Sequence, residues 1–104
     1  MAKAYLTVRA EVPEADRARF DQWYETDHLP WAKRVFGARR AMRCWSRSEP
    51  GVHLAIYEFD TVEAAQAIGT SEAIKPLVAD FDRVWGDRVP RRREILEIAQ
   101  ELGG

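Results

Sequence analysis

The fold is decided by VHLAIYEF, residues 52–59, which is the clearest β-strand in this 104-residue chain. The stretch is rich in β-branched and aromatic residues, and the turn-forming run Ser-Glu-Pro-Gly at 48–51 comes directly before it. Asp60 and Glu63 follow the strand with capping-box spacing, which predicts a helix that Gly69 ends. The sequence therefore predicts a turn, a β-strand and a helix in succession over residues 48–69, and the other elements are assigned relative to these three.

Three more strands are predicted from alternating patterns of β-forming residues, at 4–11, 38–47 and 93–99. The first helix starts at Pro13, where a missing N–H costs nothing. Pro30 should end or kink that helix, because proline disfavours helical geometry in the residue before it. Residues 31–36 are expected to form a short irregular or helical extension.

The last helix is predicted at about residues 71–85, with its regular part delayed by Pro76. The resulting order is β-α-β-β-α-β, with the second helix split in two. The sequence thus predicts one α+β domain over residues 1–104, ferredoxin-like, with an antiparallel four-stranded sheet.

Both faces of the predicted strands carry apolar side chains. In the strand at 52–59 the two sets are Leu54 and Ile56 on one face and Ala55, Tyr57 and Phe59 on the other. The helices of such a fold cover one face only, and an exposed apolar patch of more than a few hundred Å² usually marks an interface. We therefore expect a twofold homodimer whose sheets meet face to face, the alternative being a monomer with a mildly apolar second face.

Composition limits the classes of function. Sixteen basic and seventeen acidic residues leave a formal charge of −1, which argues against a nucleic-acid-binding protein. No apolar run approaches the roughly 20 residues that span a bilayer, and the first residues become charged too early for a signal peptide. Cys44 has no partner for an internal disulfide, and no Cys/His spacing predicts a metal site. A cytoplasmic protein is expected.

The run FDQWYETDHLP, residues 20–30, resembles the Trp/Tyr…His-x-Pro signature of EthD-like proteins, which belong to the dimeric α+β barrel superfamily. The later run at 59–81 is similar to the strand exit, Ala-rich helix and following helix of that family. The resemblance implies a homodimer in which each protomer holds a pocket between helices and sheet. It also implies relatives that include polyketide cyclases, muconolactone-type isomerases, cofactor-free monooxygenases and haem-degrading enzymes.

His28 is the candidate catalytic residue. It shares a helical stripe with Phe20 and Tyr24, so it is expected to face the interior. An interior imidazole can move a proton near neutral pH without a cofactor. Burial favours its neutral form whereas a helix C-terminus favours the cation, and a purely structural role as a helix cap is the alternative.

Four further residues are candidates for binding a substrate: Tyr24, Trp31, Arg43 and Tyr57. The three aromatic residues could form the walls of an apolar pocket, although such side chains are usually core. Arg43 could pair with a substrate carboxylate or enolate, or with a glutamate of the same fold. No cofactor and no metal are predicted.

The function predicted from these residues is cofactor-free proton transfer by an isomerase, cyclase or monooxygenase-like enzyme. Its substrate would be a small aromatic or polyketide-like carbonyl compound. The alternatives are a non-catalytic ligand-binding or regulatory homodimer, and a haem-handling protein with a single histidine ligand. RNA recognition by a similar element order is not expected, because Leu54 and Ile56 occupy the strand positions where such domains carry base-stacking aromatics.

Overall fold

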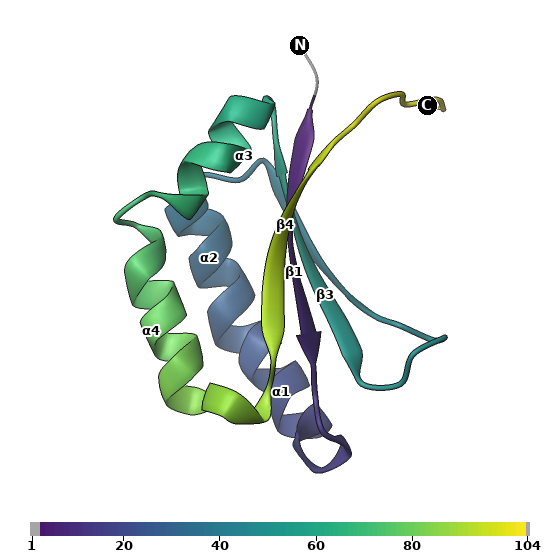
Figure 1. Ribbon diagram of the computed structural model, residues 1–104, viewed down its shortest axis with the longest axis vertical. Coiled ribbons are helices and arrows are strands. Elements are labelled where there is room, and N and C mark those ends of the chain that lie inside the picture. Colours follow the sequence, from purple (N-terminus) through teal and green to yellow (C-terminus); the bar gives the residue numbers. More distant parts are fainter. Residues whose placement is uncertain (1–2, 104) are drawn as a thin grey trace.

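Two central strands, β1 (Ala4–Glu11) and β3 (Val52–Phe59), pair antiparallel along their whole length in the computed structural model, which describes residues 3–103. β2 (Arg40–Trp45) lies beside β3 and β4 (Arg91–Glu97) beside β1, so the strand order is β2-β3-β1-β4 (Figure 1). All three pairings are antiparallel. The predicted ferredoxin-like α+β fold with a four-stranded antiparallel sheet is confirmed.

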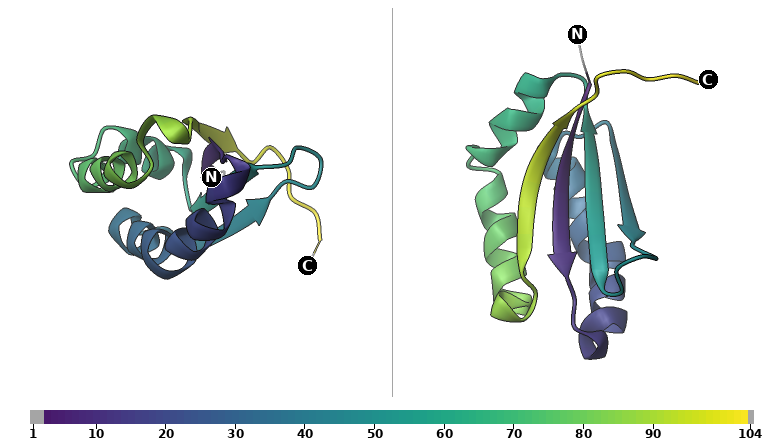
Figure 2. Two further views of the ribbon diagram at one scale, coloured as in Figure 1. Left: turned by 90° about the horizontal axis from the view of Figure 1, so that it is seen from below. Right: turned by 45° about the vertical axis from the view of Figure 1, so that its right-hand side comes forward.

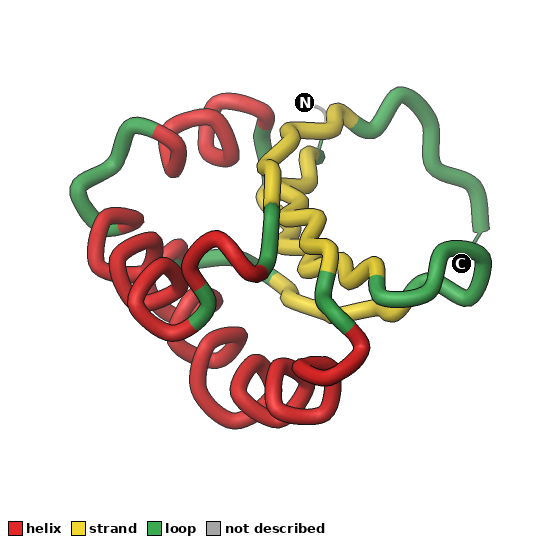
Figure 3. The backbone as a smooth tube through the Cα atoms, turned by 60° about the horizontal axis from the view of Figure 1, so that its bottom comes forward, coloured by secondary structure: helices red, strands yellow, loops and turns green. Residues whose placement is uncertain are grey.

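The helices lie on one side of this sheet (Figures 2 and 3). Between β1 and β2 come η1 (Glu14–Asp16), α1 (Arg17–Trp23), the π-helical turn η2 (Tyr24–His28) and α2 (Leu29–Phe36). Between β3 and β4 come α3 (Val62–Gly69), α4 (Ile74–Val84) and η3 (Gly86–Arg88). No helix within residues 3–103 combines the length and apolar character needed to cross a membrane.

Strand register determines which side chains meet the helices. Leu6 of β1 pairs with Tyr57 of β3 and with Ile95 of β4, and the residues two positions away continue the same face. This face forms the core, in which Leu6 and Tyr57 are fully buried. Successive side chains of the central strands point to opposite faces of the sheet, and the set that includes Leu6 and Tyr57 forms the core between sheet and helices.

No helix of residues 3–103 covers the opposite face of the sheet, which is partly apolar. Its apolar side chains, here called the open-face patch, are Tyr5, Met42, Leu54, Ile56 and Leu96. Met42 is 37% exposed and Leu96 is 42% exposed. The expectation that both faces of the sheet are apolar holds within residues 3–103.

Pro30 was expected to end or kink the first helix; instead the helical chain continues through it, and residues 31–36 form the helical version of the predicted extension. The chain passes from α1 through η2 into α2, and Pro30 occupies the first turn of α2. In η2 the Leu29 N–H donates to the carbonyl of Tyr24, five residues earlier. This wider turn changes the backbone pattern just before the proline, so the missing N–H of Pro30 falls where a helix start tolerates it.

The cap of α3 is also different from the one predicted. Thr61, and not Asp60, is the N-cap, because its hydroxyl accepts a hydrogen bond of 3.0 Å from the Ala64 N–H. Asp60 instead accepts a hydrogen bond of 2.6 Å from Arg39. Asp60 and Thr61 are adjacent, and both are residue types that commonly cap helices, so the sequence alone did not decide between them. The ion pair with Arg39 holds the Asp60 carboxylate, and Thr61 is the cap.

The last strand begins two residues earlier than predicted and ends two residues earlier. β4 starts at Arg91, so the run Arg91-Arg92-Arg93 belongs to the strand instead of leading into it. Arg91 pairs with Ala10 and Arg93 with Val8 in the ladder. This register places Arg91 and Arg93 on the helix side of the sheet and Arg92 on the open face.

Candidate functional site

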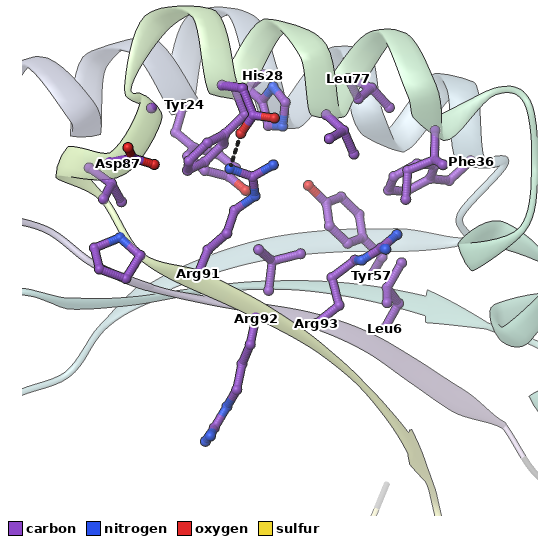
Figure 4. A pocket seen from close by; sticks show the side chains of 18 residues that line it. Leu6, Tyr24, His28, Phe36, Tyr57, Leu77, Asp87, Arg91, Arg92 and Arg93 are labelled. Atoms are coloured by element: carbon purple, nitrogen blue, oxygen red, sulfur yellow. Dashed lines mark hydrogen bonds and ion pairs between the residues drawn. The ribbon is translucent and has the colours of Figure 1, made fainter.

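A cavity of about 470 Å³ lies between the sheet and α4, open to solvent on one side (Figure 4). Its apolar walls come from the helix-facing residues of β1 and from α4, including Leu6, Val8, Leu77 and Phe81. Its polar side chains come from η2, β3, α4, η3 and the start of β4: Tyr24, His28, Tyr57, Asp82, Asp87, Arg91 and Arg93. An apolar cavity with a few converging polar groups is the usual form of a small-molecule site.

His28 closes one wall of this cavity from the end of η2. Its imidazole is 7% exposed and stacks on Trp23, with ring centroids 4.5 Å apart and planes inclined by 19°. Burial lowers the pKa of His28 to about 4; nearby Arg91 adds to this effect and Asp80 opposes it. Within the described chain the buried Nδ1 atom of His28 has no hydrogen-bond partner. His28 is therefore a neutral imidazole at neutral pH, held by packing alone.

Tyr24 and Tyr57 bring two phenol groups to the same cavity. Burial raises the pKa of Tyr24 to about 12, with the Tyr57 hydroxyl acting in the opposite direction. Burial also raises the pKa of Tyr57, and the neighbouring Tyr24 adds to it. The Tyr57 hydroxyl points from β3 toward the helices (Figure 4). Both phenols stay protonated at neutral pH and can donate hydrogen bonds to a ligand.

Two arginines of β4 reach the cavity from its sheet side. Arg91 donates a hydrogen bond of 2.9 Å to Asp82 of α4, and its guanidinium carbon lies 3.9 Å from the Phe81 ring centroid. Arg93 also lines the cavity, whereas the Arg92 side chain points away from it (Figure 4). Neither Arg91 nor Arg93 was predicted as a site residue. The alternation Arg91, Arg93, Ile95 was the signal that could have placed the first two in the pocket.

Trp31 and Arg43 are not among the residues that line this cavity. The Trp31 ring lies edge-on to His28, with centroids 6.3 Å apart, so it packs against the site from outside. Arg43 donates a hydrogen bond of 2.9 Å to Asp21, which also accepts one of 2.7 Å from the Trp45 indole N–H. These bonds hold Arg43 between β2 and α1, away from any ligand in the cavity.

His53, the second histidine of the chain, belongs to this Arg43 cluster. It is fully buried, with Nε2 3.3 Å from Arg43 Nη1 and its ring centroid 4.7 Å from that of Tyr24. Burial, and next the charge of Arg43, lower its pKa to about 4. His53 therefore supports Tyr24 from behind and does not line the cavity.

No group of three or more metal-binding side chains of the His, Cys, Asp or Glu type occurs within residues 3–103. The groups that the cavity does offer are a neutral imidazole, two phenols, two guanidinium ions and the carboxylates of Asp82 and Asp87, the first of which is paired with Arg91. Such a set can accept a proton at His28 and stabilise a negative charge at Arg91 or at the phenols.

No protein-family model matches the sequence, and no curated protein sequence matches it either. Solved structures, in contrast, match over nearly the whole chain. An EthD (ethyl tert-butyl ether D) family protein from Bacillus halodurans C-125 is 20% identical, with a TM-score of 0.67 over 90% of this chain and 97% of that one. SnoaB, a cofactor-independent oxygenase from Streptomyces nogalater, is 15% identical, with a TM-score of 0.71 over 98% of both chains.

A dimeric ferredoxin-like protein from an uncultured marine organism is 14% identical, with a TM-score of 0.63 over 98% of this chain and 100% of that one. At these identities the likeness concerns the backbone arrangement. This chain therefore has the ferredoxin-like α+β fold that the EthD family protein, the cofactor-independent oxygenase and the dimeric ferredoxin-like protein share.

Proposed function

We propose that the protein is a small enzyme that moves a proton on an aromatic or polyketide-like carbonyl compound without a cofactor. The observation that carries the proposal is the convergence of a buried neutral imidazole, two protonated phenols and a guanidinium on one largely apolar cavity. The similarity in fold to a cofactor-independent oxygenase supports it. The apolar walls suit a planar substrate.

In this proposal His28 accepts a proton from the carbon next to the substrate carbonyl. The electron pair of the broken C–H bond moves onto the carbonyl oxygen and forms an enolate. Arg91, held by Asp82, and the Tyr57 hydroxyl stabilise that negative charge in a site of low polarity. The enolate also stabilises the imidazolium beside it, which offsets the low pKa of free His28.

The enolate can then follow one of three routes. Reprotonation at another carbon is isomerisation, attack on a second carbonyl group is cyclisation, and reaction with O2 is oxygenation. All three share the first proton transfer, so the test addresses that step.

The test is hydrogen–deuterium exchange at the acidic carbon of planar 1,3-dicarbonyl compounds such as 2-acetyl-1-tetralone, followed by NMR in D2O. We expect the wild-type protein to accelerate exchange above the buffer rate. General-base catalysis typically contributes a factor of about 10²–10⁴, so His28→Asn should lose at least about a hundredfold. His53→Asn, which alters the other buried histidine, is the control and should keep most of the activity. Equal exchange by the wild-type and the His28→Asn proteins would remove His28 from the mechanism.

We also propose that the protein is a cytoplasmic homodimer whose two sheets meet through the open-face patch. The apolar, partly exposed side chains of that patch and the dimeric state of a protein with the same fold support this arrangement. The presence of a single cysteine, Cys44, suits a reducing compartment.

A non-catalytic ligand-binding dimer is the second candidate. One observation favours it: within residues 3–103, His28 forms no hydrogen bond with a second titratable side chain, although catalytic histidines usually have an orienting partner. This candidate predicts binding of planar compounds with no acceleration of exchange, which the same NMR experiment detects.

A further inference from the structure

Arg93 is a cation that lines the cavity beside apolar residues, and no carboxylate of residues 3–103 lies within ion-pair distance of it. Arg91, two residues earlier on the same face, has its charge balanced by Asp82 at 2.9 Å. The cavity therefore has two guanidinium groups in different surroundings: Arg91 is paired with a protein carboxylate, and Arg93 has no protein carboxylate within ion-pair distance among residues 3–103.

The two arginines lie at different ends of the cavity. Arg91 is on the side of Tyr24 and Asp87, whereas Arg93 is beside Tyr57 and Leu6 (Figure 4). Two residues along a strand span about 6 to 7 Å, which is comparable to the width of a fused pair of aromatic rings. A planar molecule with its reacting carbonyl near His28 and Arg91 would thus extend toward Arg93.

We infer that the ligand of this cavity is a planar organic acid, and that Arg93 binds its carboxylate and sets specificity for it. The inference deepens the proposed function and rests on it for the use of this cavity as the binding site. A guanidinium can bind a carboxylate with two parallel hydrogen bonds, which fixes the orientation of the ligand as well as its charge. Arg91, already bound to Asp82, remains for the carbonyl oxygen at the other end.

The experiment compares two probes of the same shape, 6-hydroxy-2-naphthoate and the neutral 6-hydroxy-2-naphthamide, by isothermal titration calorimetry. We expect the wild-type protein to bind the acid about tenfold more tightly than the amide, as one charge-assisted carboxylate interaction provides. Arg93→Gln should abolish this preference, and Arg93→Lys should retain part of it. Arg92→Gln is the matched control, because its side chain points away from the cavity, and it should keep the full preference.

Three results would overturn the inference: equal affinity of the wild-type protein for acid and amide, no binding of either probe at millimolar concentration, or an unchanged preference in Arg93→Gln. The test does not depend on catalysis. A preference for the acid without accelerated hydrogen exchange would support the carboxylate site and contradict the proposed chemistry. Accelerated exchange of neutral diketones without a preference for the acid would do the reverse.

Discussion

Both histidines of the chain are buried against aromatic rings, and this burial lowers the pKa of His28 and of His53 to about 4. In the unfolded chain each would titrate near 6.5. Between these two values the unfolded state binds more protons than the folded state, so folding becomes less favourable as the pH falls. The low pKa values of the two histidines should therefore make the free energy of unfolding depend on pH.

We predict that the free energy of unfolding is highest above about pH 6.5 and falls between about pH 6.5 and 4. Each histidine contributes a slope of at most about 1.4 kcal/mol per pH unit. Urea denaturation at several pH values in this window measures it. His28→Asn should lose roughly half of the slope. An identical slope in the variant would contradict the low pKa of His28 in the folded protein.

The same pKa value predicts the pH dependence of catalysis. Because His28 is neutral down to about pH 4, kcat/KM for hydrogen exchange should stay constant from neutral pH to near that value. A residue with an ordinary histidine pKa would instead lose activity below about 6.5. The pH profile with 2-acetyl-1-tetralone distinguishes the two. A midpoint near 6.5 would mean that another base, or a more exposed His28, carries the reaction.

Among individual residues, the sequence predicted the cavity-lining residues of the first helical segment better than those of the strands. Tyr24 and His28 were placed together by their four-residue spacing, and Tyr57 by its alternation, and all three line the cavity. Arg91 and Arg93 were missed, because three consecutive charges are typical of a solvated loop. Arg43 was expected to pair with a ligand or with a glutamate of the same fold; it binds Asp21 and also lies 3.8 Å from the Glu25 carboxylate, so the second alternative holds in part.

The helices and strands end at residues with special backbone geometry, and two glycines show how differently such ends respond to substitution. Gly37 ends α2 with a φ of 66°, and a Cβ there would meet nothing within 4 Å. Gly51, the turn residue before β3, has a φ of 88°, and a Cβ there would lie 2.7 Å from the Val12 carbonyl oxygen. A side chain at position 37 would therefore cost only the strain of a left-handed backbone. A side chain at position 51 would in addition clash with the backbone of Val12.

We predict that Gly37→Ala lowers the free energy of unfolding by about 1–2 kcal/mol, the usual cost of a left-handed alanine. Gly51→Ala should cost clearly more, because the Val12 carbonyl also accepts a hydrogen bond from Arg17 and cannot move freely. Chemical denaturation of the two variants provides a direct comparison. Equal losses would show that the turn before β3 can rearrange.

Thr61 provides a second prediction at this scale. Thr61→Ala should lower the free energy of unfolding by about 1 kcal/mol, because the Ala64 N–H loses its partner. Glu63→Ala, which alters the residue expected to complete the capping box, should change it by less than about 0.5 kcal/mol. Denaturation curves of the two variants check this assignment. A larger loss of unfolding free energy for Glu63→Ala than for Thr61→Ala would contradict Thr61 as the cap and favour the predicted capping box of Asp60 and Glu63.

The bounds of β1 and β3 were predicted to the residue, because their alternation is uninterrupted and turn residues or a helix start follow directly. β4 was predicted two residues too late, since charge patterns at an edge strand resemble those of loops. A helical extension after Pro30 was one of the two predicted alternatives, but the π-helical turn before it was not predicted, because no local sequence pattern marks the wider hydrogen bond from Leu29 to Tyr24.

For the molecule as a whole, the open-face patch determines the expected assembly. We predict a dimer, twice the 12.0 kDa chain mass, in sedimentation velocity at micromolar concentration. Ile56→Lys places a charge in the middle of the patch and should produce a monomer. Leu102→Lys, at a residue that is 85% exposed outside the sheet, should leave the dimer intact. A monomeric wild-type protein would contradict the proposed interface.

The π-helical turn η2 has a consequence for chains of different length. It holds one residue more than the α-helical turn it replaces, since its hydrogen bond joins Leu29 to Tyr24. Each residue of an α-helix rotates the chain by about 100°. Deletion of a single residue between 24 and 28 would restore ordinary bonding and turn α2 about its own axis by about that angle relative to α1. A descendant chain with this deletion could keep both the histidine and the fold, yet present a different side chain to the cavity.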